Sequence, residues 1–231
     1  ALIQLLSQAK DSAGRIQIPG FYDDVENAGS VELESWQSLP FNEAEFLSRE
    51  VGATALTGES EYSVLERVWS RPTLEVHGIA GGFTGAGAKT VIPAEATAKV
   101  SFRLVPNQNP EKIVAAFRQF VAERAPAGVT TEVRLLSGGP ACMVNPDHPA
   151  IRVAASAFEE TFERETVFVR SGGSIPIVGD FATHLGIPTI LMGFGLPDDG
   201  LHSPNEKFAV ENYYKGIHTV ARFLEKYGES S

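Results

Sequence analysis

The sequence predicts two regions of different fold class, an α+β region over residues 1–140 and an α/β region over residues 141–231. Residues 96–104 alternate apolar and polar side chains, as expected of a strand with one buried face. Residues 167–169 and 187–192 are uninterrupted apolar runs, which suit strands buried on both faces of a parallel sheet. The change between the two patterns follows the turn at 138–140 and places the boundary there.

The composition is that of a globular protein, with 43% hydrophobic and 21% charged residues. The net charge of -10 argues against a nucleic-acid partner. The sequence contains no apolar run of about 20 residues and does not open with a secretory signal, so we expect no membrane partner and a cytoplasmic location. The lone Cys142 cannot form an internal disulfide or a zinc site made of clustered cysteines.

The first ten residues form one apolar helical face but have no residue before them that could cap the helix. We therefore expect the chain to begin within a helix of a longer protein; the alternative is processing that leaves a frayed terminal helix. Residues 11–60 carry few periodic signals, although Asn42 is placed to cap a short helix over 43–50.

Helix and strand patterns then alternate through the first region. Apolar spacing predicts a helix over 62–69, and polar–apolar alternation predicts strands over 73–77 and 129–135. Asn109 and Pro110 form a helix start before a core-facing apolar stripe. These elements predict an antiparallel sheet with helices on one face.

The second region begins with a helix whose apolar residues run from Ile151 to Phe162. The predicted buried strands at 167–169 and 187–192 follow it. A last helix is expected after the sequence Ser-Pro-Asn-Glu at 203–206, which has the pattern of a capping box with proline in the first turn.

A glycine-rich segment at 81–90 has some features of a phosphate-binding loop. That motif requires Gly-Lys-Thr to be contiguous and to open a helix, whereas Ala88 separates Gly87 from Lys89 and a strand follows. The segment is therefore interpreted as a loop whose backbone approaches another group closely.

Two segments contain candidate anion-binding groups. Arg103 lies on the polar face of its predicted strand, where its fork of donors suits a carboxylate, although such arginines are commonly solvated. The sequence Arg-Ser-Gly-Gly-Ser-Ile-Pro at 170–176 follows a predicted buried strand and precedes a helix, a position typical of ligand sites. It predicts anion or substrate binding; a structural turn and a nucleophilic Ser174 are the alternatives.

His202 lies in the segment 198–206, beyond the second predicted buried strand and before the last predicted helix. An imidazole in this position can ligate a metal ion, or it can be satisfied by local hydrogen bonds. A catalytic zinc ion needs about three protein ligands, and no second ligand at suitable spacing is evident nearby.

Four segments taken together, 90–93, 102–106, 170–176 and 198–206, resemble one family in order and spacing. This family is the dinuclear zinc peptidases that include aminoacylases, carboxypeptidases and carnosinase-type dipeptidases, and the dipeptidase branch is the most similar. The resemblance extends from about Pro72 to Tyr227.

The resemblance implies an α+β lid that also forms a homodimer, over residues 1–140, followed by the last part of an α/β zinc domain, over residues 141–231. His202 would be a metal ligand. Thr90, Arg103, Gly173 and Ser174 would grip the substrate's C-terminal carboxylate, some of the lid residues acting across the dimer.

The same resemblance implies that the other metal ligands and the glutamate general base precede residue 1, so this chain would contain no catalytic residue and would be inactive alone. Ser171 stands where the dipeptidase branch carries Glu, and Ser137 where it carries His. The first change affects recognition of a substrate amine, and the second affects oxyanion stabilisation.

The expected reaction of the intact enzyme is hydrolysis of an amide bond in a dipeptide or N-acyl amino acid with a free carboxylate. Two zinc ions are the expected cofactors, with manganese or cobalt as alternatives. The competing hypotheses are a non-catalytic dimerisation module and a nucleotide-binding protein built on residues 81–90.

Overall fold

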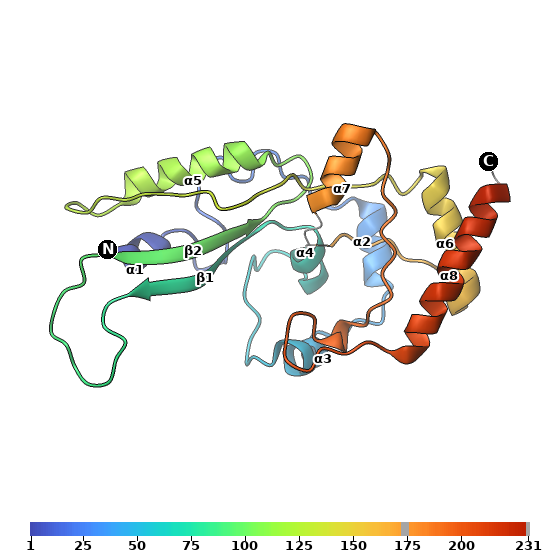
Figure 1. The fold of residues 1–231 in the computed structure, drawn as a ribbon, viewed down its shortest axis with the longest axis horizontal. Coiled ribbons are helices and arrows are strands. Elements are labelled where there is room, and N and C mark those ends of the chain that lie inside the picture. Colours follow the sequence, from blue (N-terminus) through green and yellow to red (C-terminus); the bar gives the residue numbers. More distant parts are fainter. Residues whose placement is uncertain (172–175, 230–231) are drawn as a thin grey trace. The chain divides into compact units, whose positions relative to one another are not determined.

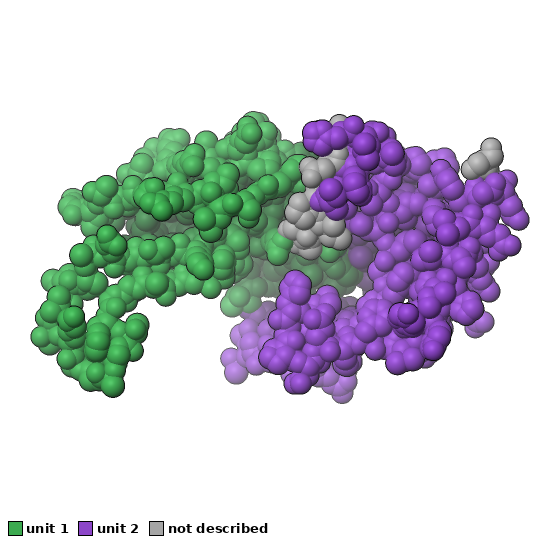
Figure 2. Space-filling view, viewed as in Figure 1, with its two compact units in different colours: residues 1–28, 57–142, 171–176 green, residues 29–56, 143–170, 177–231 purple. Residues whose placement is uncertain are grey.

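The computed structural model describes residues 1–171 and 176–229. The chain forms two compact units, which Figure 2 colours separately. Unit 1 comprises residues 1–28, 57–142 and 171–176; unit 2 comprises residues 29–56, 143–170 and 177–231. The predicted division of the sequence at 140/141 remains a prediction.

Unit 1 contains a two-stranded antiparallel sheet and three of the described helices (Figure 1). In chain order these elements are α1 (Leu2–Leu6), α4 (Val64–Trp69), β1 (Thr73–Gly81), β2 (Ala96–Arg103) and α5 (Pro110–Arg124). The strand register runs from Thr73 opposite Arg103 to Gly81 opposite Ala96, with an irregularity between Val76 and Gly78. Both strands were predicted, and β1 extends beyond the expected end at His77.

The core of unit 1 lies between the sheet, α5 and the N-terminal segment. Its buried members come from α1, the segment 9–21, β1 and α5: Leu5, Ala9, Ile16, Ile18, Phe21, Leu74, Ile113, Phe120 and Val121. Val100, Phe102 and Leu104 pack against this cluster, as the alternation in 96–104 predicted. Arg103 is exposed on the opposite side of the strand, because successive side chains of a strand point to opposite faces.

A buried ion pair lies immediately before β1 in unit 1. Arg71 Nε and Nη2 donate to the two carboxylate oxygens of Glu59 at 2.6 and 3.1 Å, and the two side chains are 5% and 8% exposed. Arg71 Nη1 also donates to the Asn27 side chain at 2.9 Å. The Arg71 guanidinium lies 4.1 Å from the ring centre of Tyr62, so aromatic and polar contacts both hold it in place.

Unit 2 consists of helices and turns in the described residues. They are α2 (Ser30–Gln37), α3 (Glu43–Glu45), a π-helical turn η1 (Phe46–Val51), α6 (Pro149–Phe162), α7 (Pro176–Asp180), a second π-helical turn η2 (Phe181–Leu185), a 3-10 turn η3 (Pro197–Asp199) and α8 (Val210–Glu229). α7 begins at the last residue of unit 1 and continues into unit 2. The described helices are not long and apolar enough to cross a membrane.

Helices α6 and α8 pack against each other (Figure 1). Gly216 of α8 faces Phe194 so closely that a Cβ atom there would lie 3.2 Å from the ring. The Phe194 ring stacks in turn on Phe158 of α6, with 5.1 Å between ring centres. Lys226 near the end of α8 forms an ion pair with Glu160 of α6. Thus a glycine, an aromatic stack and a salt bridge set the spacing of the two helices.

Three predicted strands are absent from the described residues. Segments 129–135, 167–169 and 187–192 have no strand structure, because a strand requires a hydrogen-bonded neighbour and none of the three is paired in a ladder. In the first segment, Val133 packs against the core while Glu132 and Arg134 pair with each other outside it. The apolar–polar alternation in residues 129–135 therefore reflects contact of one face with the core, without strand pairing.

The predicted start of the last helix is also wrong. α8 begins at Val210, and residues 203–205 lie in turns before it. The Ser203 hydroxyl donates to Gly200 O at 2.6 Å, and Asn205 has a φ of 64°, which is incompatible with a right-handed helix. Helix α2 is a further difference, because residues 11–60 carry few periodic signals and no helix was expected over Ser30–Gln37.

Candidate functional site

Arg103 is the last residue of β2 and lies opposite Thr73 in the sheet. The strand holds the start of its side chain on the exposed face, away from the core formed by Phe102 and Leu104. A turn closed by Gln108 follows: the Gln108 carboxamide accepts from Val105 N at 2.9 Å and donates to Phe21 O at 2.7 Å. This buried amide anchors the chain two residues after Arg103.

Thr90 is exposed in the long connection between β1 and β2, at 82–95. This connection leaves the sheet where Gly81 pairs with Ala96, and Figure 1 shows it extending beyond that end of the hairpin. Arg103 lies at the opposite end of β2 from Ala96. Because a strand rises about 3.3 Å per residue, these two ends of β2 are about 23 Å apart. Within unit 1 the structure therefore does not bring Thr90 and Arg103 together.

The turn predicted to bind substrate is only partly described. Gly173 and Ser174 lie outside the described residues. Arg170, which precedes the turn, donates from Nε and Nη2 to the two carboxylate oxygens of Glu32 at 2.8 and 2.6 Å. These hydrogen bonds hold the pKa of the Glu32 carboxyl below its usual value, although partial burial opposes the shift.

His202 belongs to unit 2 and lies in a loop between η3 and α8. Its side chain is exposed, and its φ of 62° is in the left-handed region that non-glycine residues seldom adopt. The loop closes on itself, because Lys207 N donates to Asp199 O at 2.9 Å. His202 therefore protrudes from a loop whose two ends are joined.

Asp199 is a buried carboxylate in the same loop and was not among the predicted site residues. It is 2% exposed, and its Oδ2 accepts from Leu196 N at 2.7 Å. Its Oδ1 is buried without a hydrogen-bond partner, and the Lys207 ammonium lies 3.9 Å away. Its neighbour Asp198 pairs with Lys207 at 2.6 Å, and this hydrogen bond lowers the pKa of the Asp198 carboxyl.

The zinc ions that the resemblance implies would need several ligands close together, and the described residues do not provide such a set. Among them, no three His, Cys, Asp or Glu side chains lie close enough together to hold a metal ion. In the loop that carries His202, the buried oxygen without a hydrogen-bond partner is Asp199 Oδ1. The other carboxylate oxygen of Asp199 already accepts from Leu196 N. The described part of the chain thus offers at most a share of a zinc site, and a catalytic zinc ion needs about three protein ligands.

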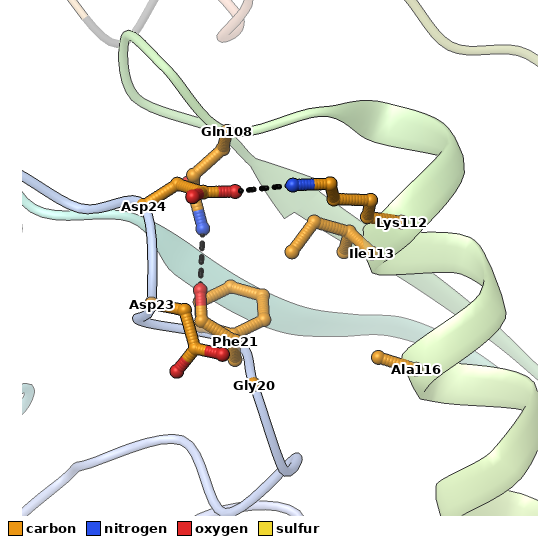
Figure 3. Close-up of a pocket in the computed structure, with 8 residues that line it drawn as sticks. All are labelled: Gly20, Phe21, Asp23, Asp24, Gln108, Lys112, Ile113 and Ala116. Carbon is orange, nitrogen blue, oxygen red and sulfur yellow. Dashed lines mark hydrogen bonds and ion pairs between the residues drawn. The ribbon is translucent and has the colours of Figure 1, made fainter.

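A small cavity of about 250 Å³ lies in unit 1, between the segment 20–24 and α5 (Figure 3). One wall carries the hydrogen bond from Gln108 to Phe21, and at its rim Lys112 pairs with Asp24 at 3.2 Å. None of the predicted site residues lines it. Gln108, Lys112 and Asp24 are engaged in these contacts, so they do not point to a particular ligand.

Sequence reasoning identified single residues but missed the contacts that hold them. Glu32 and Arg170 are 138 residues apart in the sequence, and no local pattern relates them. Asp199 carried one local signal, since it precedes Gly200, whose φ of 67° permits a tight turn after the 3-10 helix.

Comparison with known proteins establishes the family. The chain belongs to Peptidase family M20/M25/M40, whose sequence model matches residues 25–226. This confirms the resemblance inferred from the four motifs. Its relatives in the family include a metallodipeptidase and a dipeptidase.

Among these relatives, the Cys-Gly metallodipeptidase DUG1 of Candida albicans is 35% identical over 99% of this chain and 48% of its own length. The human Beta-Ala-His dipeptidase is 32% identical over 96% of this chain and 44% of its length. Among solved structures, the M20 family metallo-carboxypeptidase Sso-CP2 from Sulfolobus solfataricus matches with a TM-score of 0.84 and 28% identity over 98% of this chain and 51% of that one. The chain therefore spans about half the length of the relatives it matches.

Proposed function

We propose that this chain is the C-terminal half of a zinc-dependent peptidase that hydrolyses dipeptides or N-acyl amino acids with a free carboxylate. The observation that carries the proposal is the alignment of 99% of the chain with 48% of a Cys-Gly metallodipeptidase. The human Beta-Ala-His dipeptidase supports the same substrate class, since its name also specifies a dipeptide as substrate.

In this proposal the chain contributes substrate binding. Arg103 is exposed at the end of a strand anchored by the core and by Gln108, so its guanidinium can pair with a substrate carboxylate through two parallel hydrogen bonds. Gly173 and Ser174 would offer further donors to the same group. This assignment of residues is part of the proposal.

The separation of Thr90 from Arg103 supports the proposed homodimer. The two residues lie at opposite ends of the β1–β2 hairpin, so one copy cannot present both to a single small carboxylate unless the long connection folds back. Two copies paired through unit 1 could place Thr90 of one beside Arg103 of the other. Light scattering tests the pairing directly: a mass near twice 24.8 kDa supports it, and a monomer at all concentrations contradicts it.

Zinc dependence belongs to the same proposal, with His202 as one ligand. The described residues do not form a complete site. We therefore expect the remaining ligands and the general base to come from polypeptide outside this chain. The isolated chain should bind zinc weakly and hydrolyse no dipeptide; measurable turnover by the pure chain would contradict the proposal.

The decisive experiment is Arg103→Ala in the full-length enzyme. Loss of a charge-assisted pair worth about 1.5–3 kcal/mol should raise KM for a dipeptide roughly ten- to 150-fold. Arg134→Ala is the matched control, because Arg134 is exposed and pairs locally with Glu132. An unchanged KM for Arg103→Ala would remove this residue from the binding site.

A further inference from the structure

The carboxylate of Asp199 is buried in the loop that carries His202, although most of that loop is exposed. Asp199 is 2% exposed, whereas the side chain of Asp198 beside it is 63% exposed. The whole loop from Leu196 to Lys207 is described and belongs to unit 2. Burying a carboxylate is costly unless its contacts replace the lost water, so the contacts of Asp199 indicate what it does in the loop.

Asp199 joins the start of this loop to its end. At the start, Asp199 Oδ2 accepts from Leu196 N at 2.7 Å, and Asp199 N donates to Leu196 O at 3.1 Å. At the end, Asp199 O accepts from Lys207 N at 2.9 Å. Both ends of the segment 196–207 are therefore bound to one residue.

The backbone between these ends has a conformation that needs support. His202 and Asn205 have φ values of 62° and 64°, which non-glycine residues seldom adopt. Such residues persist only where the surrounding structure fixes them. Ser203 donates from its N and from its hydroxyl to Gly200 O, at 3.0 and 2.6 Å, and His202 lies within the turn that these bonds close. This turn begins at the residue after Asp199, so the buried aspartate anchors it.

The two oxygens of the Asp199 carboxylate act on different ends of the loop. Oδ2 is used by the bond to Leu196 N. Oδ1 is buried and has no hydrogen-bond partner among the described residues, but the Lys207 ammonium lies 3.9 Å from it. An asparagine could supply the first contact and would lose the charge of the second. The negative charge of Asp199 thus attracts the lysine at the far end of the loop.

We infer that Asp199 is a positioning residue: by joining Leu196 to Lys207, it fixes the turn from which His202 projects. The inference rests on the proposed function, in which His202 is a metal ligand. An imidazole that is held in place before a metal ion arrives loses less freedom on binding, so the anchored loop should raise the affinity for zinc. Asp199 is not proposed as a ligand, because its carboxylate is buried and bonded to Leu196.

The test compares Asp199→Ala with Asp198→Ala in this chain. Asp198 is the matched control, because it is a neighbouring carboxylate that pairs with the same Lys207 but is exposed. Hydrogen exchange followed by NMR should show the amides of Leu196, Ser203 and Lys207 exchanging about tenfold faster in Asp199→Ala, since a hydrogen bond to a charged group is lost. Amides of α6 should be unchanged, and Asp198→Ala should leave the three loop amides near their original rates. Asp199→Asn keeps an acceptor for Leu196 N and should give a smaller increase.

Unchanged exchange of the three loop amides in Asp199→Ala would overturn the inference. Equal acceleration in α6 would also overturn it, because it indicates general destabilisation. The same increase in Asp199→Asn as in Asp199→Ala would show that the bond to Leu196 N does not hold the loop. If Asp199→Ala does not fold, Asp199→Asn takes its place, with the smaller increase confined to the same amides; no increase overturns the inference.

A second measurement separates this inference from the proposed function. In the full-length enzyme, Asp199→Ala should lower the affinity for zinc about 10- to 100-fold, measured by competition with a chelator, because a residue that supports a metal ligand is lost. Asp198→Ala should keep the original affinity. If His202→Ala does not change the affinity for zinc, the proposed ligand is wrong, while the exchange result still decides whether Asp199 holds the loop. If exchange rises in Asp199→Ala but the affinity for zinc does not fall, the positioning role is overturned.

Discussion

Helix α5 of unit 1 and helix α8 of unit 2 differ in how fully their large apolar side chains are covered. In unit 1, residues from α1, β1 and α5 meet in one buried cluster. In unit 2, α8 has Gly216 and Thr219 buried on one side, but six apolar or aromatic side chains are at least 40% exposed: Tyr213, Tyr214, Ile217, Val220, Leu224 and Tyr227. Soluble monomeric proteins seldom expose a continuous apolar stripe of this kind to solvent. It offers a face on which the proposed remainder of the enzyme could pack.

The two units also differ in how they hold an arginine. Arg71 of unit 1 is buried with Glu59 and contacts Asn27 and Tyr62, whereas Arg170 of unit 2 is partly exposed with Glu32. A buried charge that loses its partner has no solvent to replace it, while a partly exposed one does. Breaking the Arg71–Glu59 pair should therefore strongly lower the free energy of unfolding of unit 1. Breaking the Arg170–Glu32 pair should affect only the local structure of unit 2.

The largest expected effect is that of Arg71→Met. Removing the guanidinium leaves Glu59 buried and unpaired, which should lower the free energy of unfolding of unit 1 by about 3–5 kcal/mol. Urea unfolding followed by circular dichroism measures it. The double variant Arg71→Met with Glu59→Leu should recover much of the loss; no recovery would show that the pair is not the source of the effect.

A matched pair of isoleucines tests the difference in burial. Ile113 of α5 is 5% exposed and Ile217 of α8 is 52% exposed. Ile113→Ala should cost about 2–5 kcal/mol, because it leaves a cavity in the core. Ile217→Ala should change stability by less than about 0.5 kcal/mol in this chain. Equal costs from thermal unfolding would mean that α8 is as well covered as α5.

A helix cap gives a smaller effect within unit 1. The Asn109 side chain accepts from Glu111 N and Lys112 N at the start of α5. Asn109→Ala should cost about 0.5–2 kcal/mol. Asn109→Asp keeps an acceptor oxygen and should remain near the original stability, so a similar loss in both variants would argue against capping as the cause.

Acidification should lower the free energy of unfolding least of all, and only through unit 2. The pKa of Glu32 is below its usual 4.5, so the unfolded chain binds a proton there more readily than the folded one. The contribution of Glu32 is therefore present above about pH 4.5 and is lost as the pH falls through the lower folded pKa. Trp36 fluorescence in a Trp69→Phe background should follow this loss, and Glu32→Gln should abolish that part of the titration.

Much of unit 1 could be predicted from the sequence, because its patterns are local. The alternation in 96–104 and the Asn109-Pro110 start of α5 both correspond to elements of the structure. The apolar runs at 167–169 and 187–192 could not be interpreted correctly, since a strand depends on a neighbour that the run does not specify. The start of α8 was placed too early because Ser203 bonds back to Gly200 instead of capping a helix.

The candidate site was also predictable only in part, where the signal is local in the sequence. Motif resemblance identified the family and selected Arg103 and His202, whose places in the structure are now described. The ion pair of Glu32 with Arg170 joins residues 138 positions apart and had no sequence signal. Sequence patterns name side chains that could react with a ligand, but they do not reveal the distant contacts that hold those side chains.

Helix α2 contacts residues 168–170, since Glu32 pairs with Arg170 and the Trp36 indole donates to Phe168 O, and this contact has a consequence for biosynthesis. α2 is complete once residue 37 has been made, yet its partners are added more than 130 residues later. At about 5–20 residues per second, the ribosome needs roughly 7–26 s to produce them. During that interval the core of unit 1, whose buried members end at Val121, can already assemble. In the nascent chain, Trp36 therefore lacks its final contacts while unit 1 folds. During that interval α2 is accessible to chaperones.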